Sequence, residues 1–297
     1  MRIIRPLDCA CDDGVLLTNV AVTETEWTAG TYTIGQQRYV DTQLYEVVVS
    51  STTDEPTAGA AKPEPTWVNI GAINRFRMFD LVVGARTTLA GDLEVSLTPT
   101  ERFAAVAFFG LRGADLSLSV ELPAEGVIYE REVLLQDFSG ITDWYDYFFG
   151  EVPTLEDVAF ADVPPVSGAT VHVTITALDG VSECGEMVVG PALEIGTTNM
   201  GTSVGIEDFS AKERDAFGGF RVIERAFSKR VDFEVTVPRR RADWVGQTLS
   251  RLRATPVVFV GDEREAATLV FGYVRDWKLT YRSLDISDLT LEAEGLT

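Results

Sequence analysis

The chain has 297 residues, with 46 acidic against 25 basic side chains and a net charge of -21. This excess of negative charge argues against a surface that follows nucleic-acid phosphates, whereas 45% hydrophobic residues are enough to bury cores in about two domains. No apolar run reaches the roughly 20 residues of a membrane helix, and the N-terminus lacks the apolar part of a signal peptide. We therefore expect a soluble, unsecreted protein with no membrane insertion and no specific nucleic-acid binding.

Three cysteines and one histidine limit the chemistry that the chain offers. Cys9 and Cys11 are too close for an ordinary disulfide, and a metal site made of Cys9, Cys11 and Cys184 lacks a fourth ligand. The only histidine, His172, lies in an alternating segment that is typical of a strand. No nucleophile elbow, phosphate loop, dinucleotide fingerprint or zinc-hydrolase motif is present in the sequence. We expect ordinary thiols, no metal, no cofactor and no enzyme activity.

Negative charge is concentrated in the middle of the chain. Residues 132–190 contain 11 acidic side chains and no basic one, and neither lysine nor arginine occurs between Arg131 and Lys212. Such a stretch repels itself unless water, cations or a basic partner screens it. Two alternatives stay open, a solvated acidic face and an assembly contact.

The first 72 residues divide into an arm and a small aromatic module. Residues 1–25 predict an N-terminal arm with a short strand, and residues 26–72 contain a Pro- and Gly-rich loop between aromatic segments. A module of this size without a disulfide has a marginal core, so we expect it to be stabilised by packing against the neighbouring domain. Its aromatic residues include Trp27, Tyr32, Tyr45 and Trp67.

Residues 73–190 have the pattern of an antiparallel β-sandwich. Apolar and polar residues alternate at 92–97, 115–122 and 170–176, as expected for a sheet with one wet face. Gly and Pro recur between these segments, and no long amphipathic helix is evident.

An aromatic cluster interrupts these strands at residues 141–150. Dense aromatic side chains favour packing or anchoring in an interface. The residues that we predict as assembly contacts are Trp144, Tyr145, Tyr147, Phe148 and Phe149. Asp143 and Asp146 leave two further hypotheses open, a calcium site and a carboxylate pair for glycoside hydrolysis.

Residues 191–297 predict a mostly-β C-terminal domain with one short helix. Asp243 can cap a helix that begins at Trp244, and Pro256 prevents its continuation. The predicted strands are 231–237, 257–260, 269–277 and 284–296.

The basic run Arg239–Arg241 is the one stretch that suggests nucleic acid. Asp243 follows almost at once, and no aromatic platform is interleaved with the arginines. A surface turn or a salt bridge between subunits is therefore the preferred interpretation.

Several stretches match a known family as a set. Residues 67–80 read W-V-N-I-G-A-I-N-R-F-R-M-F-D, close to a W, G, N-R-[WF]-R-M-F-D string. Shorter similar pieces are Thr142–Phe149, Cys184–Glu186, Gly190 with Gly196, Val204–Ser210, Thr255–Pro256, Phe271–Trp277 and Leu291–Leu296. Together they resemble tail and baseplate structural proteins of tailed bacteriophages and prophages, of the distal-tail kind.

This resemblance implies a structural component of a phage tail tip or baseplate, located in the virion tail after assembly in the host cytoplasm. It implies a symmetric oligomer, a ring or trimer around the tail axis, with copies of itself and the tail tube, hub and fibre proteins as partners. A structural subunit needs matching surfaces and sheet edges and no convergent titratable groups, which makes it our first interpretation.

The aromatic module carries a second resemblance. Trp27, Tyr32, Tyr45 and Trp67 match the W, G-x-Y, L-Y-E and closing W of small chitin-binding-type carbohydrate-binding modules. The alternative function is therefore a virion protein that binds a host-surface glycan. Sugar binding needs exposed aromatic faces, and buried rings would instead be the core of the module.

Overall fold

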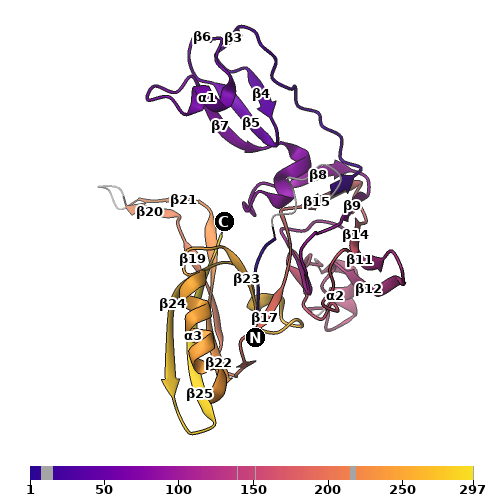
Figure 1. Cartoon of the computed structure of the whole chain (residues 1–297), viewed down its shortest axis with the longest axis vertical. Coiled ribbons are helices and arrows are strands. Elements are labelled where there is room, and N and C mark those ends of the chain that lie inside the picture. The colour runs from indigo at the N-terminus through magenta and orange to yellow at the C-terminus, as the bar shows by residue number, and fades with distance from the viewer. Residues whose placement is uncertain (8–15, 139, 151, 215–218, 297) are drawn as a thin grey trace.

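The computed structural model describes residues 1–7, 16–138, 140–150, 152–214 and 219–296. With 49% of residues in strands and 12% in helices, the predicted mostly-β class with antiparallel sheets is confirmed. Figure 1 shows the aromatic module at the top, the sandwich at the right and the C-terminal domain at the left.

The aromatic module is built from short antiparallel strands around a few large side chains. Strand β5 pairs with β4 on one side and β7 on the other, and β3 pairs with β6. The loop that the sequence predicts at its centre contains a short helix that the sequence analysis did not predict. The elements are β3 (Tyr32–Thr33), β4 (Gln37–Val40), β5 (Gln43–Val47), β6 (Ser51–Thr52), α1 (Pro56–Ala60), β7 (Trp67–Ala72) and the 3-10 helix η1 (Asn74–Phe79).

Two antiparallel sheets form the core of the sandwich, and β8 pairs with β15 in a separate two-stranded sheet. The sandwich sheet has the order β12-β11-β14-β9-β2, the central sheet has the order β13-β10-β16, and their apolar residues share one core. The strands are β2 (Leu16–Thr18), β8 (Thr87–Ala90), β9 (Leu93–Leu97), β10 (Ala105–Phe109), β11 (Asp115–Leu122), β12 (Gly126–Leu134), β13 (Val158–Phe160), β14 (Thr170–Ile175), β15 (Val181–Cys184) and β16 (Glu186–Gly190), and helix α2 (Trp144–Phe149) follows β12.

The C-terminal sheet has the order β17-β1-β23-β24-β25-β22-β18, and β19 also pairs with β22. Helix α3 packs its buried face on this sheet. The elements are β1 (Arg2–Ile4), β17 (Ala192–Glu194), β18 (Thr197–Thr198), β19 (Ser203–Asp208), β20 (Ala211–Arg214), β21 (Phe220–Ile223), β22 (Phe227–Pro238), η2 (Arg239–Arg241), α3 (Ala242–Leu252), β23 (Val257–Val260), η3 (Ala266–Thr268), β24 (Leu269–Tyr281) and β25 (Ile286–Gly295).

The central sheet is buried on both faces and joins the two domains. Val106 and Phe108 of β10 face the sandwich core, whereas Ala107 and Phe109 face a second core that includes Phe271 of the C-terminal sheet. The rings of Phe109 and Phe271 stack with their centroids 5.6 Å apart. A strand that is apolar at every position fits this double burial.

The predicted N-terminal arm does not stand apart from the domains. Strand β1 lies between β17 and β23 in the C-terminal sheet, and β2 pairs with β9 of the sandwich sheet. The backbone N–H of Arg5 donates to the carbonyl of Pro191 at 3.3 Å. A Cβ atom at Gly190 would lie 1.9 Å from the Arg5 carbonyl oxygen, so only glycine lets the N-terminal segment cross here.

The predicted start of the C-terminal helix is wrong by two residues. Helix α3 begins at Ala242, and no side chain caps it. Asp243 lies in the first turn, and its Oδ1 accepts a hydrogen bond from the hydroxyl of Tyr281 at 3.1 Å. The Asp243 carboxylate therefore bonds Tyr281, which is distant in sequence, and does not cap the helix as the local pattern predicts.

The shared core predicts a measurable coupling between the domains. Phe109→Ala removes a 3% exposed ring and its stacking on Phe271. We expect the free energy of unfolding to fall by about 3 to 5 kcal/mol in urea denaturation. Leu284→Ala, at a 91% exposed position, is the control and should change it by less than about 0.5 kcal/mol. Equal effects of the two substitutions would contradict a shared core.

Candidate functional site

The aromatic residues of the module form its core and do not present open ring faces. Trp67 is 0% exposed, Tyr32 6% and Tyr45 8%, and Trp27 packs on them half-buried. The indole Nε1 of Trp67 donates to the carbonyl of Asp54 at 3.0 Å. The prediction that Tyr32, Tyr45 and Trp67 offer exposed platforms to a sugar is therefore wrong, because so small a module needs these rings to fill its interior.

Trp67 should thus be a stability residue. Its ring meets Tyr32 edge-on with centroids 5.4 Å apart, so Trp67→Ala opens a cavity in the module. We expect a loss of about 3 to 5 kcal/mol, measured by hydrogen exchange of the module's backbone amides. Ile34→Ala, at a 65% exposed position of the same module, should leave exchange unchanged. Unaltered exchange in Trp67→Ala would refute the core assignment.

Helix α2 gathers the predicted assembly contacts on the surface. All five rings are exposed: Trp144 78%, Tyr145 70%, Tyr147 61%, Phe148 68% and Phe149 73%. The rings contact one another. Trp144 stacks on Phe148 with ring centroids 6.4 Å apart, and Tyr145 is tilted on Phe149 with centroids 5.1 Å apart. We name this surface the aromatic helix. Exposed apolar clusters of this kind mark protein interaction sites.

The carboxylates beside this cluster have a structural explanation in part. Asp143 precedes α2, and its Oδ1 accepts a hydrogen bond from the backbone N–H of Tyr145 at 2.8 Å. Its carbonyl accepts a further bond from the N–H of Tyr147 at 3.1 Å. Both contacts are those of a residue that begins a helix. The side chain of Asp146, the other half of the proposed carboxylate pair, lies outside the described residues.

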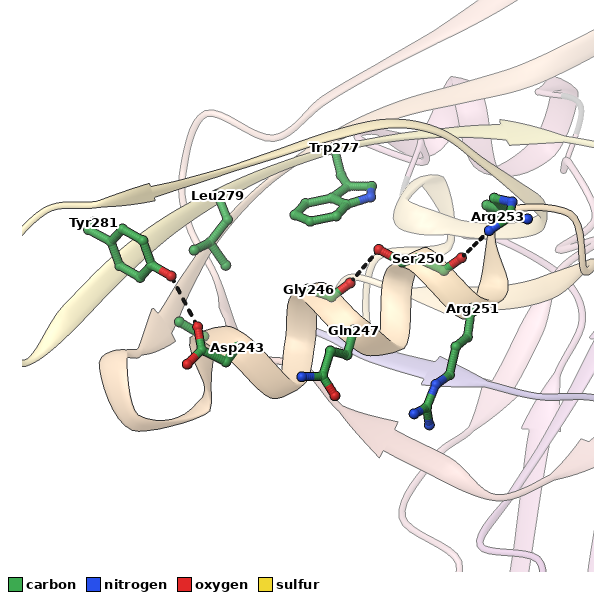
Figure 2. Close-up of a pocket in the computed structure, with 10 residues that line it drawn as sticks. Asp243, Gly246, Gln247, Ser250, Arg251, Arg253, Trp277, Leu279 and Tyr281 are labelled. Atoms are coloured by element: carbon green, nitrogen blue, oxygen red, sulfur yellow. Dashed lines mark hydrogen bonds between the residues drawn. The ribbon is translucent and has the colours of Figure 1, made fainter.

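A groove runs between α3 and β24, with a volume of about 780 Å³. Figure 2 shows Trp277, Leu279 and Tyr281 reaching from β24 toward the helix. Gly246 brings the helix close to Trp277, since a Cβ there would lie 3.4 Å from the indole ring. The hydroxyl of Ser250 donates to the Gly246 carbonyl at 2.8 Å, one turn earlier in the same helix. The groove is thus an aromatic-lined depression open to solvent.

Arg251 and Arg253 line this groove, and the three arginines of η2 directly precede the helix that forms one of its walls. Arg239 lies over the ring of Tyr281 at 4.3 Å, and Arg241 lies over the ring of Trp244 at 4.9 Å. Arg240, Arg251 and Arg253 are exposed. In the described part of the chain, no carboxylate forms an ion pair with any of these five arginines. Arg239–Arg241 form the short helix η2, and the salt bridge between subunits stays a prediction. We name the groove with its arginines the basic groove.

A hollow of about 650 Å³ lies at the junction of the two domains, and Asp157, one of the residues that line it, pairs with Lys229. Lys229 donates to the carbonyls of Ala266 and Leu269 at 2.7 Å and to Asp157 at 3.3 Å. Three bonds satisfy every donor of the ammonium group. Burial raises the pKa of Asp157, which the nearby Lys229 opposes. These contacts tie the sandwich to the C-terminal domain.

Glu186 is a buried carboxyl with no basic partner in the described part of the chain. It is 1% exposed, and its Oε2 accepts a hydrogen bond from the backbone N–H of Leu81 at 2.9 Å. Burial first and the charge of Asp80 second raise the pKa of Glu186 to about 9. Leu81 has a φ of 64°, a strained backbone state for leucine that this hydrogen bond helps to hold.

The raised pKa predicts a pH-dependent stability. The unfolded carboxyl titrates near its model value of 4.5 and the folded one near 9, so the native state is favoured at low pH and loses stability as pH rises between these values. Relative to Glu186→Gln, the wild type should lose up to about 1.4 kcal/mol per pH unit in this window. Urea denaturation at pH 6 and pH 8 measures the difference. A difference that does not change with pH would contradict the assignment.

Of the cysteines and the histidine, the structure describes Cys184 and His172. Burial raises the pKa of Cys184, which is 1% exposed, and Cys9 and Cys11 lie outside the described residues. His172 lies on β14, where its Nδ1 is 2.8 Å from the hydroxyl of Ser96. Within the described ranges, no group of three or more His, Cys, Asp or Glu residues is arranged to hold a metal ion. None of the described helices combines the length and apolar character needed to cross a bilayer.

Comparisons with known proteins assign this chain to no family. Neither the protein-family models nor the curated proteins give a match to this chain.

The basic groove is the site that sequence reasoning missed. Arg239–Arg241 and the segment that ends at Trp277 were each noted, but their proximity depends on the pairing of β24 with β25 and on the packing of α3. The aromatic helix was identified as a surface by its composition, although its helical form was not.

Proposed function

We propose that the chain is a structural subunit of the tail tip or baseplate of a tailed bacteriophage, where it forms a symmetric oligomer around the tail axis. The resemblance of residues 67–80 and of the shorter pieces to tail proteins supports this assignment. The observation that carries it is the aromatic helix, whose rings are 61 to 78% exposed. Exposed aromatic side chains are the usual anchors of protein interfaces, because covering them removes a large apolar area from water.

A second apolar surface supports assembly. The β20–β21 hairpin extends away from the rest of the C-terminal domain in Figure 1. Apolar side chains on and beside it are exposed, namely Ile206, Phe209, Phe220, Val222 and Phe227. A two-stranded hairpin is marginally stable alone in water, so contact with a neighbouring subunit would stabilise it.

The distribution of charge favours partners with basic surfaces. The aromatic helix lies within residues 137–151, which carry four acidic side chains and no basic one. Farther along the acidic stretch, Glu156, Asp157, Asp162 and Glu183 pair with basic side chains of other segments. Complementary charge speeds association and selects the partner, even where it adds little affinity.

The alternative of glycan binding through the module lacks its chemical basis. A pyranose ring stacks on an open aromatic face, and the rings of Tyr32, Tyr45 and Trp67 are buried. We therefore do not propose a sugar site there.

The tail assignment predicts that the chain is part of a particle. In particles purified from a host that carries the gene, mass spectrometry should find the chain at a fixed ratio to the tail-tube protein, and antibody labelling should place it at the tail tip. A cytoplasmic host enzyme is the matched control and should be lost on purification. A chain that stays in the lysate while intact tails form without it would refute the proposal.

A further inference from the structure

Two surfaces of this molecule are opposite in charge. The aromatic helix lies within residues 137–151, which contain four acidic side chains and no basic one, whereas residues 238–256 around the basic groove contain five arginines and a single acidic residue, Asp243. In a chain of net charge -21, so local a basic cluster is unexpected unless it has an acidic partner.

The two surfaces also offer a pocket and exposed anchors. The groove is a depression of about 780 Å³ lined by Trp277, Leu279 and Tyr281, and the aromatic helix carries five exposed rings. Aromatic residues and arginine are the types most enriched at protein interfaces, and anchors of one partner fit pockets of the other.

The two surfaces lie apart within one molecule. Figure 1 shows α2 beside the sandwich and α3 in front of the C-terminal sheet, with the junction of the two domains between them. The shared core around Phe109 and Phe271 fixes this separation. Contact between the two surfaces therefore requires two copies of the chain.

Resting on the proposed structural function, we infer that the aromatic helix of one copy docks into the basic groove of the next. The contact joins two different surfaces, so it is head-to-tail, and an open chain of copies keeps one free aromatic helix at one end and one free groove at the other until a ring closes. The carboxylates that lie in and next to α2 in the sequence meet the arginines that have no carboxylate partner among the described residues. The occupant of the groove is thus a second copy of this chain.

Two variants that each lose one surface test this arrangement. Trp144→Ala with Phe148→Ala removes two rings that are 78% and 68% exposed, and Arg251→Glu with Arg253→Glu reverses two exposed charges. Each variant alone should be monomeric in sedimentation and native mass spectrometry under conditions in which the wild type assembles. An equimolar mixture should form a 1:1 pair of twice the 32.5 kDa chain mass and nothing larger, because only one intact contact can form.

Matched controls separate this contact from general effects of mutation. Ile34→Ala with Leu284→Ala removes apolar groups that are 65% and 91% exposed elsewhere, and Arg102→Glu with Arg264→Glu makes the same charge change at exposed positions outside the groove. Both should assemble as the wild type does. Tyr145→Ala with Phe149→Ala provides a second disruption of the aromatic helix, and circular dichroism should show unchanged folding in all variants. Raising the salt concentration should weaken wild-type assembly, since it screens opposite charges.

Three results would overturn the inference: a wild-type chain that stays monomeric, a groove variant that assembles normally, or a mixture that forms no pair. A groove variant that assembles normally while the aromatic-helix variants do not would instead indicate a two-fold contact between aromatic helices. Because the presence of the chain in particles is measured separately, any of these results leaves the tail assignment standing. Its absence from particles, with pairing intact, would remove the tail assignment alone.

Discussion

The burial of strands on both faces is the constraint on which the rest of the structure depends. In β10, alternate residues face the sandwich core and the core shared with the C-terminal sheet. In β23, Val257 and Phe259 face α3, while Val258 and Val260 face the central sheet. Sheets that share side chains in this way cannot slide or separate without exposing apolar surface to water. The two domains therefore behave as one body, and the segments attached to them hold fixed positions.

The joined domains hold the aromatic helix and the basic groove at fixed positions relative to each other. The aromatic helix comes directly after β12, an edge strand of the sandwich sheet. The basic groove lies on the face of the C-terminal sheet opposite to the shared core. A rigid body with two unlike, complementary surfaces is suited to repeat around an axis, because the angle between the surfaces sets the rotation from one copy to the next. The half-buried ion pair of Lys229 with Asp157 and the crossing at Gly190 strengthen the same junction.

The sequence was informative where one local pattern determines the structure. The alternation at 115–122 corresponds to β11, and the apolar run at 257–260 corresponds to β23, because burial follows the two-residue period of a strand. The sequence was uninformative where contacts between distant segments determine the structure. The partners of β1 and β2, the hydrogen bond that draws Asp243 to Tyr281, and the meeting of α3 with Trp277 depend on contacts that no local window contains. The sugar-site hypothesis for the aromatic module was misleading for another reason. A small core and a sugar platform use the same residue types, and only the exposure of the rings distinguishes the two.

Assembly through unlike surfaces is the central claim, and a reconstruction of the purified wild-type oligomer by electron cryo-microscopy tests it most directly. The account predicts a closed ring in which α2 of each copy lies against α3 and β24 of its neighbour, with the stacked sheets unchanged inside each subunit. A reconstruction in which α2 faces solvent, or meets its own equivalent across a two-fold axis, would contradict it.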